Sequence, residues 1–207
     1  RLEAAQGPAR QAAADVQGGK VFLEKGAITY HLFDLEGLRA DHDVNATQPR
    51  IRGHVYRMKF EGSNPSHMRA SLDEKQQTYS NYFLGNEPSQ WAGQCGHYHQ
   101  VQVQSLYDGI DLQLHGDGPF LKYDLIVEPF ADAAQIAMVY EGHNKLELEN
   151  ERLVVYTSIG DVTEQKPLAW QIIEGEKHPV ACRYKLKNNI VSFDFPKGYD
   201  HGHTLII

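Results

Sequence analysis

The sequence predicts an all-β protein, built as an antiparallel two-sheet β-sandwich with very little helix. Three observations lead to this prediction: apolar and polar residues alternate with a period of two, turn residues separate the alternating runs, and helical periodicity is scarce. A period of two places successive side chains on opposite faces of a strand, so one face is buried and the other is solvated. An extended super-sandwich is the variant of this fold that the same pattern allows.

The alternation is clearest in three segments, in each of which the apolar residues share one face: Ile110, Leu112 and Leu114; Tyr123, Leu125 and Val127; Cys182, Tyr184 and Leu186. Turn residues separate such runs, notably Asn188-Asn189, because asparagine tolerates the positive φ of a tight hairpin. The segments 116–119 and 149–151 are expected to be turns of the same kind. In the second half of the chain these signals recur about every 8–12 residues, as in a sandwich or barrel.

Helix is expected at only two places. The alanine-rich segment 11–14 fits either one helical turn or a first strand, and Asp132 is a candidate cap for a short turn at 133–135. The polar segments 37–49 and 64–77 are predicted to be surface loops, with room for a short strand inside the second.

The chain is expected to form a single β-sandwich domain over residues 1–207, because no segment has the composition of a linker. A chain of this length buries enough surface to fold without a disulfide or a metal. It begins at Arg1 without the features of a signal peptide and stops within an apolar run at Ile207, so we expect a fragment of a longer multidomain protein.

Charge and hydropathy exclude several partners. The net charge is −7, and nucleic acid and anionic membrane surfaces both require a basic face. No apolar run approaches the roughly 18 residues of a membrane-spanning helix. We therefore predict no nucleic-acid partner and no direct insertion into a membrane.

The two cysteines, Cys95 and Cys182, allow two alternatives. A disulfide between them would close a long loop and stabilise the fold by about 4–5 kcal/mol. The favoured alternative is two separate buried thiols, since free cysteine is among the most buried residue types. Neither cysteine belongs to a CxxC pair, which argues against a structural zinc site.

Six runs, in this order along the chain, carry a family resemblance: Gly-Gly-Lys-Val-Phe-Leu-Glu-Lys-Gly at 18–26, Asn-Tyr-Phe-Leu-Gly-Asn-Glu-Pro-Ser-Gln-Trp at 81–91, Leu-Tyr-Asp-Gly-Ile-Asp-Leu at 106–112, Leu-Lys-Tyr-Asp-Leu-Ile-Val at 121–127, Thr-Ser-Ile-Gly at 157–160 and Thr-Leu-Ile-Ile at 204–207. The chain resembles an uncharacterised domain at the N-terminal end of large secreted bacterial proteins. In that family the domain precedes β-propeller-type repeats and adhesin-like modules, and many members end in a sorting domain of the type IX secretion (gliding-motility-associated) pathway.

The resemblance implies a secreted or cell-surface location in a bacterium and partners among the other domains of the same protein. It implies no catalytic residues, because none is assigned in the family. Two departures concern local detail: residues 1–10 replace the family's usual opening, and Gly96-His97-Tyr98 differs from the expected tripeptide.

Histidines are the strongest candidates for a metal site. His97 and His99 are two apart, so on a strand both imidazoles would point the same way, about 7 Å apart, as two ligands of zinc or copper can. They also share parity with Val101 and Val103, which favours the interpretation that they extend an apolar face. We therefore predict no metal and no cofactor, with His97 and His99 as the only candidate ligands.

No catalytic residue is predicted, and the chain is not expected to be an enzyme. Five carboxylates crowd adjacent predicted strands, as the paired carboxylates of a glycosidase would: Asp108, Asp111, Asp117, Asp124 and Glu128. Turn chemistry at Asp108-Gly109 and cross-strand ion pairs explain such charges without catalysis. The sequence holds no GxSxG elbow and no phosphate-binding glycine loop before a helix.

Aromatic residues leave one binding alternative open. Six aromatic residues could form a platform for sugar rings: Trp91, Tyr98, Tyr107, Tyr123, Trp170 and Tyr199. For any one of them packing in the core is favoured, because a large aromatic buries roughly 150–250 Å². Trp91 and Trp170 are the candidate ligand-binding residues, and an extracellular glycan or protein is the candidate ligand. Trp91 is expected to close a corner over the core, so that Trp91→Ala would cost about 3–5 kcal/mol. The predicted function is a non-catalytic structural or interaction module, the alternative is a carbohydrate-binding module, and a metal-dependent enzyme is the third hypothesis.

Overall fold

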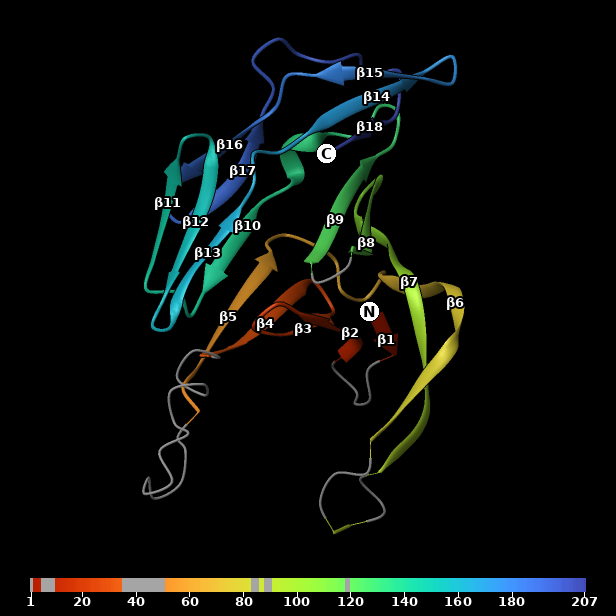
Figure 1. Cartoon of the computed structure of the whole chain (residues 1–207). Coiled ribbons are helices and arrows are strands. Elements are labelled where there is room, and N and C mark those ends of the chain that lie inside the picture. Colours follow the sequence, from red (N-terminus) through yellow and green to blue (C-terminus); the bar gives the residue numbers. More distant parts are fainter. Residues whose placement is uncertain (1, 5–9, 35–50, 83–85, 88–90, 118–119) are drawn as a thin grey trace.

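The computed structural model describes residues 2–4, 10–34, 51–82, 86–87, 91–117 and 120–207. These residues form eighteen β-strands and one three-residue 3₁₀ helix, η2 (Ala133–Gln135), and the paired strands run antiparallel (Figure 1). The prediction of an all-β, antiparallel fold with very little helix is therefore confirmed. Within the described residues, no helix has both the length and the apolar character needed to cross a membrane.

Fifteen strands belong to one large sheet, in which β6 (Arg69–Tyr82) pairs with β7 and the others follow this order: β15 (Glu176–Val180), β14 (Ala169–Ile173), β18 (Leu205–Ile206), β9 (Phe120–Val127), β8 (Ile110–Asp117), β7 (Ala92–Tyr107), β1 (Leu2–Ala4), β2 (Arg10–Val16), β3 (Gly19–Glu24), β4 (Ala27–Phe33), β5 (Gly53–Phe60), β10 (Met138–Glu141), β17 (Ile190–Asp194) and β16 (Arg183–Lys187). The small sheet has three strands: β11 (Lys145–Glu149), β12 (Arg152–Thr157) and β13 (Gly160–Glu164).

The division into sheets differs from the predicted two-sheet sandwich. One edge of β7 pairs with β6, while the opposite edge pairs with β8 over residues 100–107 and with β1 at His97 and Tyr98. Two arms of a single sheet therefore leave the same edge of β7 and curl around the interior (Figure 1). A period of two marks buried faces but cannot tell whether two such faces belong to one sheet, because pairing partners are not written in the local pattern.

Both arms contribute to one hydrophobic cluster. On the β8–β9 arm, the alternating residues are almost fully buried, as predicted: Ile110, Leu112, Leu114, Leu125 and Val127. The β1–β5 arm adds buried residues to the same cluster: Leu2, Ala12, Val21, Leu23, Ile28, Tyr56, Met58 and Phe60. Burial of this apolar area is the main stabilising term of the fold.

Local turn predictions are confirmed where the structure describes them. Asn188 and Asn189 have φ of 51° and 63° and join β16 to β17. Asn150 and Glu151 have φ of 49° and 64° and join β11 to β12. Asp132 caps η2, since its carboxylate accepts a hydrogen bond from the Ala134 N–H at 2.9 Å.

Two segments require a different assignment. Residues 11–14 lie in strand β2, which resolves the alternative of a helical turn. The predicted loop at 64–77 is wrong from Arg69 onward, because β6 runs for fourteen residues and pairs with β7 in a long two-stranded ribbon (Figure 1). Its polar side chains obscured the alternation. The predicted loop at 37–49 and the tip of the turn at 118–119 lie outside the described residues.

Candidate functional site

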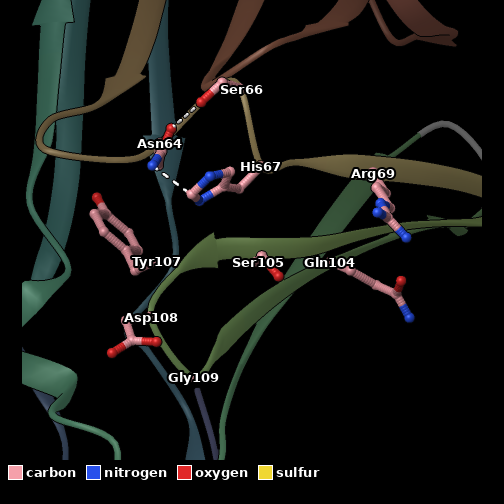
Figure 2. A pocket seen from close by; sticks show the side chains of 9 residues that line it. All are labelled: Asn64, Ser66, His67, Arg69, Gln104, Ser105, Tyr107, Asp108 and Gly109. Carbon is pink, nitrogen blue, oxygen red and sulfur yellow. Dashed lines mark hydrogen bonds between the residues drawn. The ribbon is translucent and has the colours of Figure 1, made fainter.

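A polar cleft of about 560 Å³ lies between the loop that follows β5 and the end of β7 (Figure 2). It is lined by Asn64, Ser66, His67, Arg69, Gln104, Ser105, Tyr107, Asp108 and Gly109. Every lining residue except Gly109 carries a side-chain group that can donate or accept a hydrogen bond. The volume lies within the range of small-ligand sites, although this lining is more polar than usual for such sites.

The β7 wall is shaped by a bulge at Ser105. The register between β7 and β8 shifts between Val103 and Tyr107, and Ser105 has a φ of 55°. A non-glycine residue in this region costs about 1–3 kcal/mol, so its surroundings must hold it there. Asp111 does so, because its Oδ1 accepts a hydrogen bond from the Ser105 N–H at 2.8 Å. Bulges of this kind redirect side chains next to functional sites.

The opposite wall is ordered by a chain of side-chain hydrogen bonds (Figure 2). The Ser66 hydroxyl donates to Asn64 Oδ1 at 2.6 Å, which orients the amide, and Asn64 Nδ2 then faces His67 Nδ1 at 3.0 Å. An amide nitrogen can only donate, so Nδ1 of His67 accepts. In the neutral ring the proton therefore lies on Nε2, which makes Nε2–H a hydrogen-bond donor.

The cleft holds two opposite charges, Arg69 and Asp108. Neither side chain has an ion-pair or hydrogen-bond partner within the described part of the chain. Asp108 belongs to the predicted Asp108-Gly109 turn, which joins β7 to β8. Gly109 has a φ of 67°, and a Cβ there would lie 2.7 Å from the Cβ of Ala131, so glycine is required at this turn.

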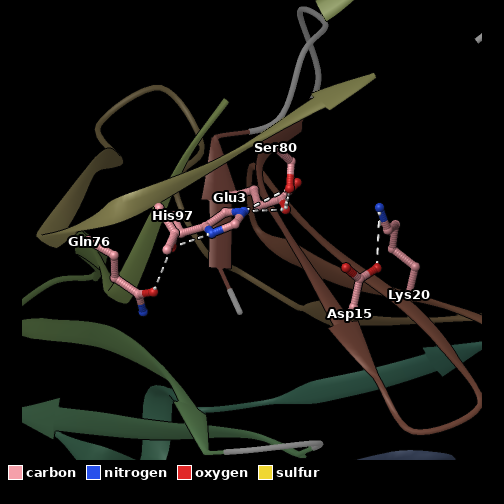
Figure 3. Close-up of polar contacts among 7 residues, drawn as sticks. Glu3, Asp15, Lys20, Gln76, Ser80 and His97 are labelled. Atoms are coloured by element: carbon pink, nitrogen blue, oxygen red, sulfur yellow. Dashed lines mark hydrogen bonds and ion pairs between the residues drawn. The ribbon is translucent and has the colours of Figure 1, made fainter. Parts of the chain in front are cut away.

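His97, the first predicted metal candidate, is buried in a different place, between β6 and β1 (Figure 3). Its Nδ1 lies 2.9 Å from Thr78 Oγ1, and its Nε2 lies 2.8 Å from Ser80 Oγ and 3.1 Å from Glu3 Oε1. Both ring nitrogens are thus occupied by protein groups. The interpretation that His97 extends the apolar face is confirmed by its burial beside Val101 and Val103.

His99, the second candidate, is exposed, and its Nε2 lies 3.2 Å from Gln76 Nε2. The expectation that it shares the burial of His97 is therefore wrong. Across the described ranges, no three His, Cys, Asp or Glu side chains are grouped so that they could hold a metal ion.

The two tryptophans lie apart from the cleft. Trp91 is 42% exposed, so the prediction that it closes a corner over the core is wrong. The residues that would form this corner, 83–85 and 88–90, lie outside the described residues. Trp170 is half-buried on β14, with Lys177 Nζ 4.5 Å from its ring centre. The structure does not bring the two rings into one binding surface with the cleft.

Cys95 and Cys182 are both free thiols, which excludes the disulfide alternative in this structure. Cys182 is buried as predicted, whereas Cys95 is only half-buried. Burial raises the pKa of the Cys182 thiol to about 12, so it stays protonated and is a poor nucleophile.

A second polar cluster, which the sequence did not reveal, surrounds the carboxylate of Glu164 at the end of β13. Tyr140 and Tyr123 donate hydrogen bonds to it at 2.7 and 3.1 Å. Burial raises the pKa of Glu164, and the hydroxyls of Tyr140, Tyr123 and Tyr184 partly offset this by bonding the carboxylate. The cluster ties the small sheet to strands β9, β10 and β16 of the large one.

The residues that line the cleft could have been found in part. Within β7, Val101 and Val103 are buried at odd positions, whereas Leu106 is buried at an even one. Such a change of parity within one alternating run indicates an inserted residue, that is, a bulge near 104–105. No comparable signal in the sequence marks Asn64 or Arg69, because only the tertiary fold brings them next to the end of β7.

No curated protein and no solved structure shows significant similarity to this chain. The family described as "Domain of unknown function (DUF7948)" matches residues 5–207. The chain therefore belongs to this family of domains of unknown function.

Proposed function

We propose that this chain is a non-catalytic interaction module of a secreted or cell-surface bacterial protein, and that it binds an extracellular partner in the polar cleft. The cellular context rests on the resemblance of the six sequence runs to N-terminal domains of large secreted proteins. In such a protein, the neighbouring β-propeller-type repeats and a type IX sorting domain are further partners of the module.

The observation that carries the binding role is the geometry of the cleft. Ser105 is held in a left-handed conformation by Asp111, and the Asn64–His67 pair is ordered by Ser66. Both walls are thus preorganised, which lowers the entropic cost of binding a partner. The guanidinium of Arg69 and the Nε2–H of His67 line the cleft, where a ligand or water can accept their hydrogen bonds.

The titratable groups inside the fold support a non-catalytic role. His97 and Glu164 have the chemistry of general acids and bases, yet each is bonded to side chains from neighbouring strands. These bonds join neighbouring strands, and His97 is only 2% exposed, which keeps its imidazole away from a substrate. Polar groups inside the fold thus bond to one another, while those of the cleft remain available to a partner, as expected of a scaffold with an external binding cleft.

Binding can be tested with the fluorescently labelled chain on the extracellular matrix of cultured bacterial biofilms. The wild-type chain is expected to bind saturably, and the double variant Arg69→Ala/Gln104→Ala is expected to lose most of this binding. The control is Arg183→Ala, because Arg183 lies on β16 in an exposed ion pair with Asp194. Equal binding by wild type and double variant, or no saturable binding, would contradict the proposal.

The cellular context needs a separate measurement. Antibody labelling of intact cells that express the full-length parent protein should detect this module outside the cell. Labelling only after the cells are permeabilised would contradict a surface or secreted location.

A further inference from the structure

We infer that the cleft is a site for an uncharged, hydroxyl-rich saccharide, an inference that rests on the proposed binding role of the same cleft. The walls of the cleft carry one cation, one carboxylate, two amides, two serine hydroxyls and one imidazole. Three properties of this set select the ligand: its charge balance, its mixture of donors and acceptors, and the lack of aliphatic side chains among the described residues that line the cleft.

Charge balance argues for a neutral ligand. Arg69 and Asp108 contribute one positive and one negative charge to the same cleft, and neither is neutralised by another side chain in the described part of the structure. A ligand with a net charge would gain from one of these residues and be repelled by the other. A neutral ligand that offers lone pairs to Arg69 and protons to Asp108 satisfies both.

The mixture of donors and acceptors argues for hydroxyl groups. Arg69 and His67 Nε2–H can donate, Asp108 can accept, and Gln104 and Ser105 can do both. A hydroxyl has one proton and two lone pairs, so adjacent hydroxyls on a sugar ring can pair with both kinds of group. Removing water from these protein groups without replacing its hydrogen bonds would be unfavourable, which excludes an apolar ligand.

The lining also argues against a peptide anchored by an apolar side chain. Among the described residues that line the cleft, Tyr107 is the one with a phenol or phenyl ring, and this residue is only 5% exposed. Its hydroxyl donates to the carbonyl of Ala137 at 3.2 Å, so the ring is fixed as a floor. Interfaces with peptides draw their affinity from buried aromatic or aliphatic anchors, and this cleft offers no apolar pocket for one.

The inference predicts weak and polar binding. Because each hydrogen bond to the protein replaces one to water, a single sugar residue should bind with a Kd on the order of 0.1–1 mM. We would titrate the purified chain with neutral oligosaccharides of glucose, xylose and mannose, each against its uronic-acid counterpart, by nuclear magnetic resonance. At least one neutral series should shift the signals of His67 and Ser105.

Variants of the cleft give the second readout. Arg69→Ala should weaken binding of the neutral oligosaccharide about 10- to 100-fold, since hydrogen bonds to charged groups have that value. Gln104→Ala should weaken it about 2- to 10-fold, since Gln104 is uncharged and exposed. Arg183→Ala should bind like the wild type. Thermal melts of the four proteins show whether a lost signal reflects lost folding, and Arg69→Lys provides a variant that keeps the charge.

Treating the biofilm matrix with periodate or with protease tests the saccharide ligand separately from the proposed binding role of the module. Periodate cleaves vicinal diols, so periodate-treated matrix should no longer bind the chain, while protease-treated matrix should bind it fully. Binding that resists periodate and is lost after protease would overturn the saccharide and leave the interaction module intact. Selective binding of the uronic-acid series would overturn the inferred neutrality of the ligand. Absence of all matrix binding would overturn both proposals.

Discussion

The cleft and the Glu164 cluster are built from similar polar groups that are used in opposite ways. Around Glu164, tyrosine hydroxyls from separate strands converge on one carboxylate, and the bonds are made within the protein. In the cleft, Arg69 and Asp108 lie in the same cavity and remain without a protein partner among the described residues. The first arrangement stabilises the fold, and the second leaves interactions for a partner.

The difference shows whether a polar group contributes to the free energy of folding or to the free energy of binding. A buried polar group that loses its partner retains the full desolvation cost, so the Glu164 cluster should be sensitive to every deletion. An exposed polar group is solvated when its partner is absent, so the cleft should tolerate deletions without loss of stability. The four predictions below test this contrast, from the largest expected effect on stability to the smallest.

Glu164→Ala should destabilise the protein most. The substitution leaves the hydroxyls of Tyr123 and Tyr140 without their acceptor in a region where burial is strong. The expected loss is about 3 kcal/mol or more in the free energy of unfolding, measured by urea denaturation. Glu151→Ala is the matched control, because Glu151 forms an exposed ion pair with Lys166. Equal losses in the two variants would show that the cluster is not structural.

His97→Ala should have the next largest effect. The imidazole contacts Thr78, Ser80 and Glu3, and its loss would leave a cavity beside the buried carboxylate of Glu3. We expect a loss of about 2–3 kcal/mol, again from urea denaturation. His99→Ala on the same strand is the control, since His99 is exposed and should cost less than about 0.5 kcal/mol. A His99 effect as large as that of His97 would contradict this assignment.

Stability should also depend on pH through Glu164. Burial raises the pKa of this carboxyl above its usual value near 4.5, so the folded state favours its protonated form. The contribution to stability is therefore complete below about pH 4.5 and declines as pH rises through the folded pKa. The tyrosines around it have raised pKa values and do not ionise in this range.

Glu164→Gln removes this titration and keeps the shape of the side chain. The difference in unfolding free energy between wild type and Glu164→Gln should therefore shift against the wild type as pH rises from below the usual carboxyl pKa of 4.5 through the raised one. Urea midpoints at several pH values measure it. Parallel pH profiles for the two proteins would show that Glu164 is not perturbed.

These two regions also show how far sequence reasoning reaches. Strand faces such as Ile110–Leu112–Leu114 and turns such as Asn188-Asn189 are correct because their signals are local: a period of two and a tolerance of positive φ. The burial of His97 follows from the same local parity. The arms that leave β7, by contrast, depend on which strand pairs with which edge, and no local pattern encodes that choice.

The Glu164 cluster lay beyond prediction for the same reason. Tyr123 and Tyr140 are 41 and 24 residues away from Glu164 in sequence, on strands whose neighbours were unknown. Trp91 was misjudged because aromatic residues are usually buried, and only the folded chain shows it to be 42% exposed. The cleft left one readable trace, the change of parity before Leu106, while the side chains of the opposite wall are assembled by tertiary contact.

Arg69→Ala gives the smallest expected change in stability and the sharpest test of the contrast. Arg69 is exposed at the start of β6, and its side chain has no ion-pair or hydrogen-bond partner within the described residues, so its truncation breaks no such bond in the folded state. The free energy of unfolding should change by less than about 0.5 kcal/mol. Ligand binding should nevertheless fall, because Arg69 carries the one permanent positive charge among the described residues that line the cleft. A variant that melts like the wild type and no longer binds matrix would show that Arg69 serves binding and not folding. A loss of stability comparable to that of Glu164→Ala would instead place Arg69 in the structural network and remove the main support for the cleft as a binding site.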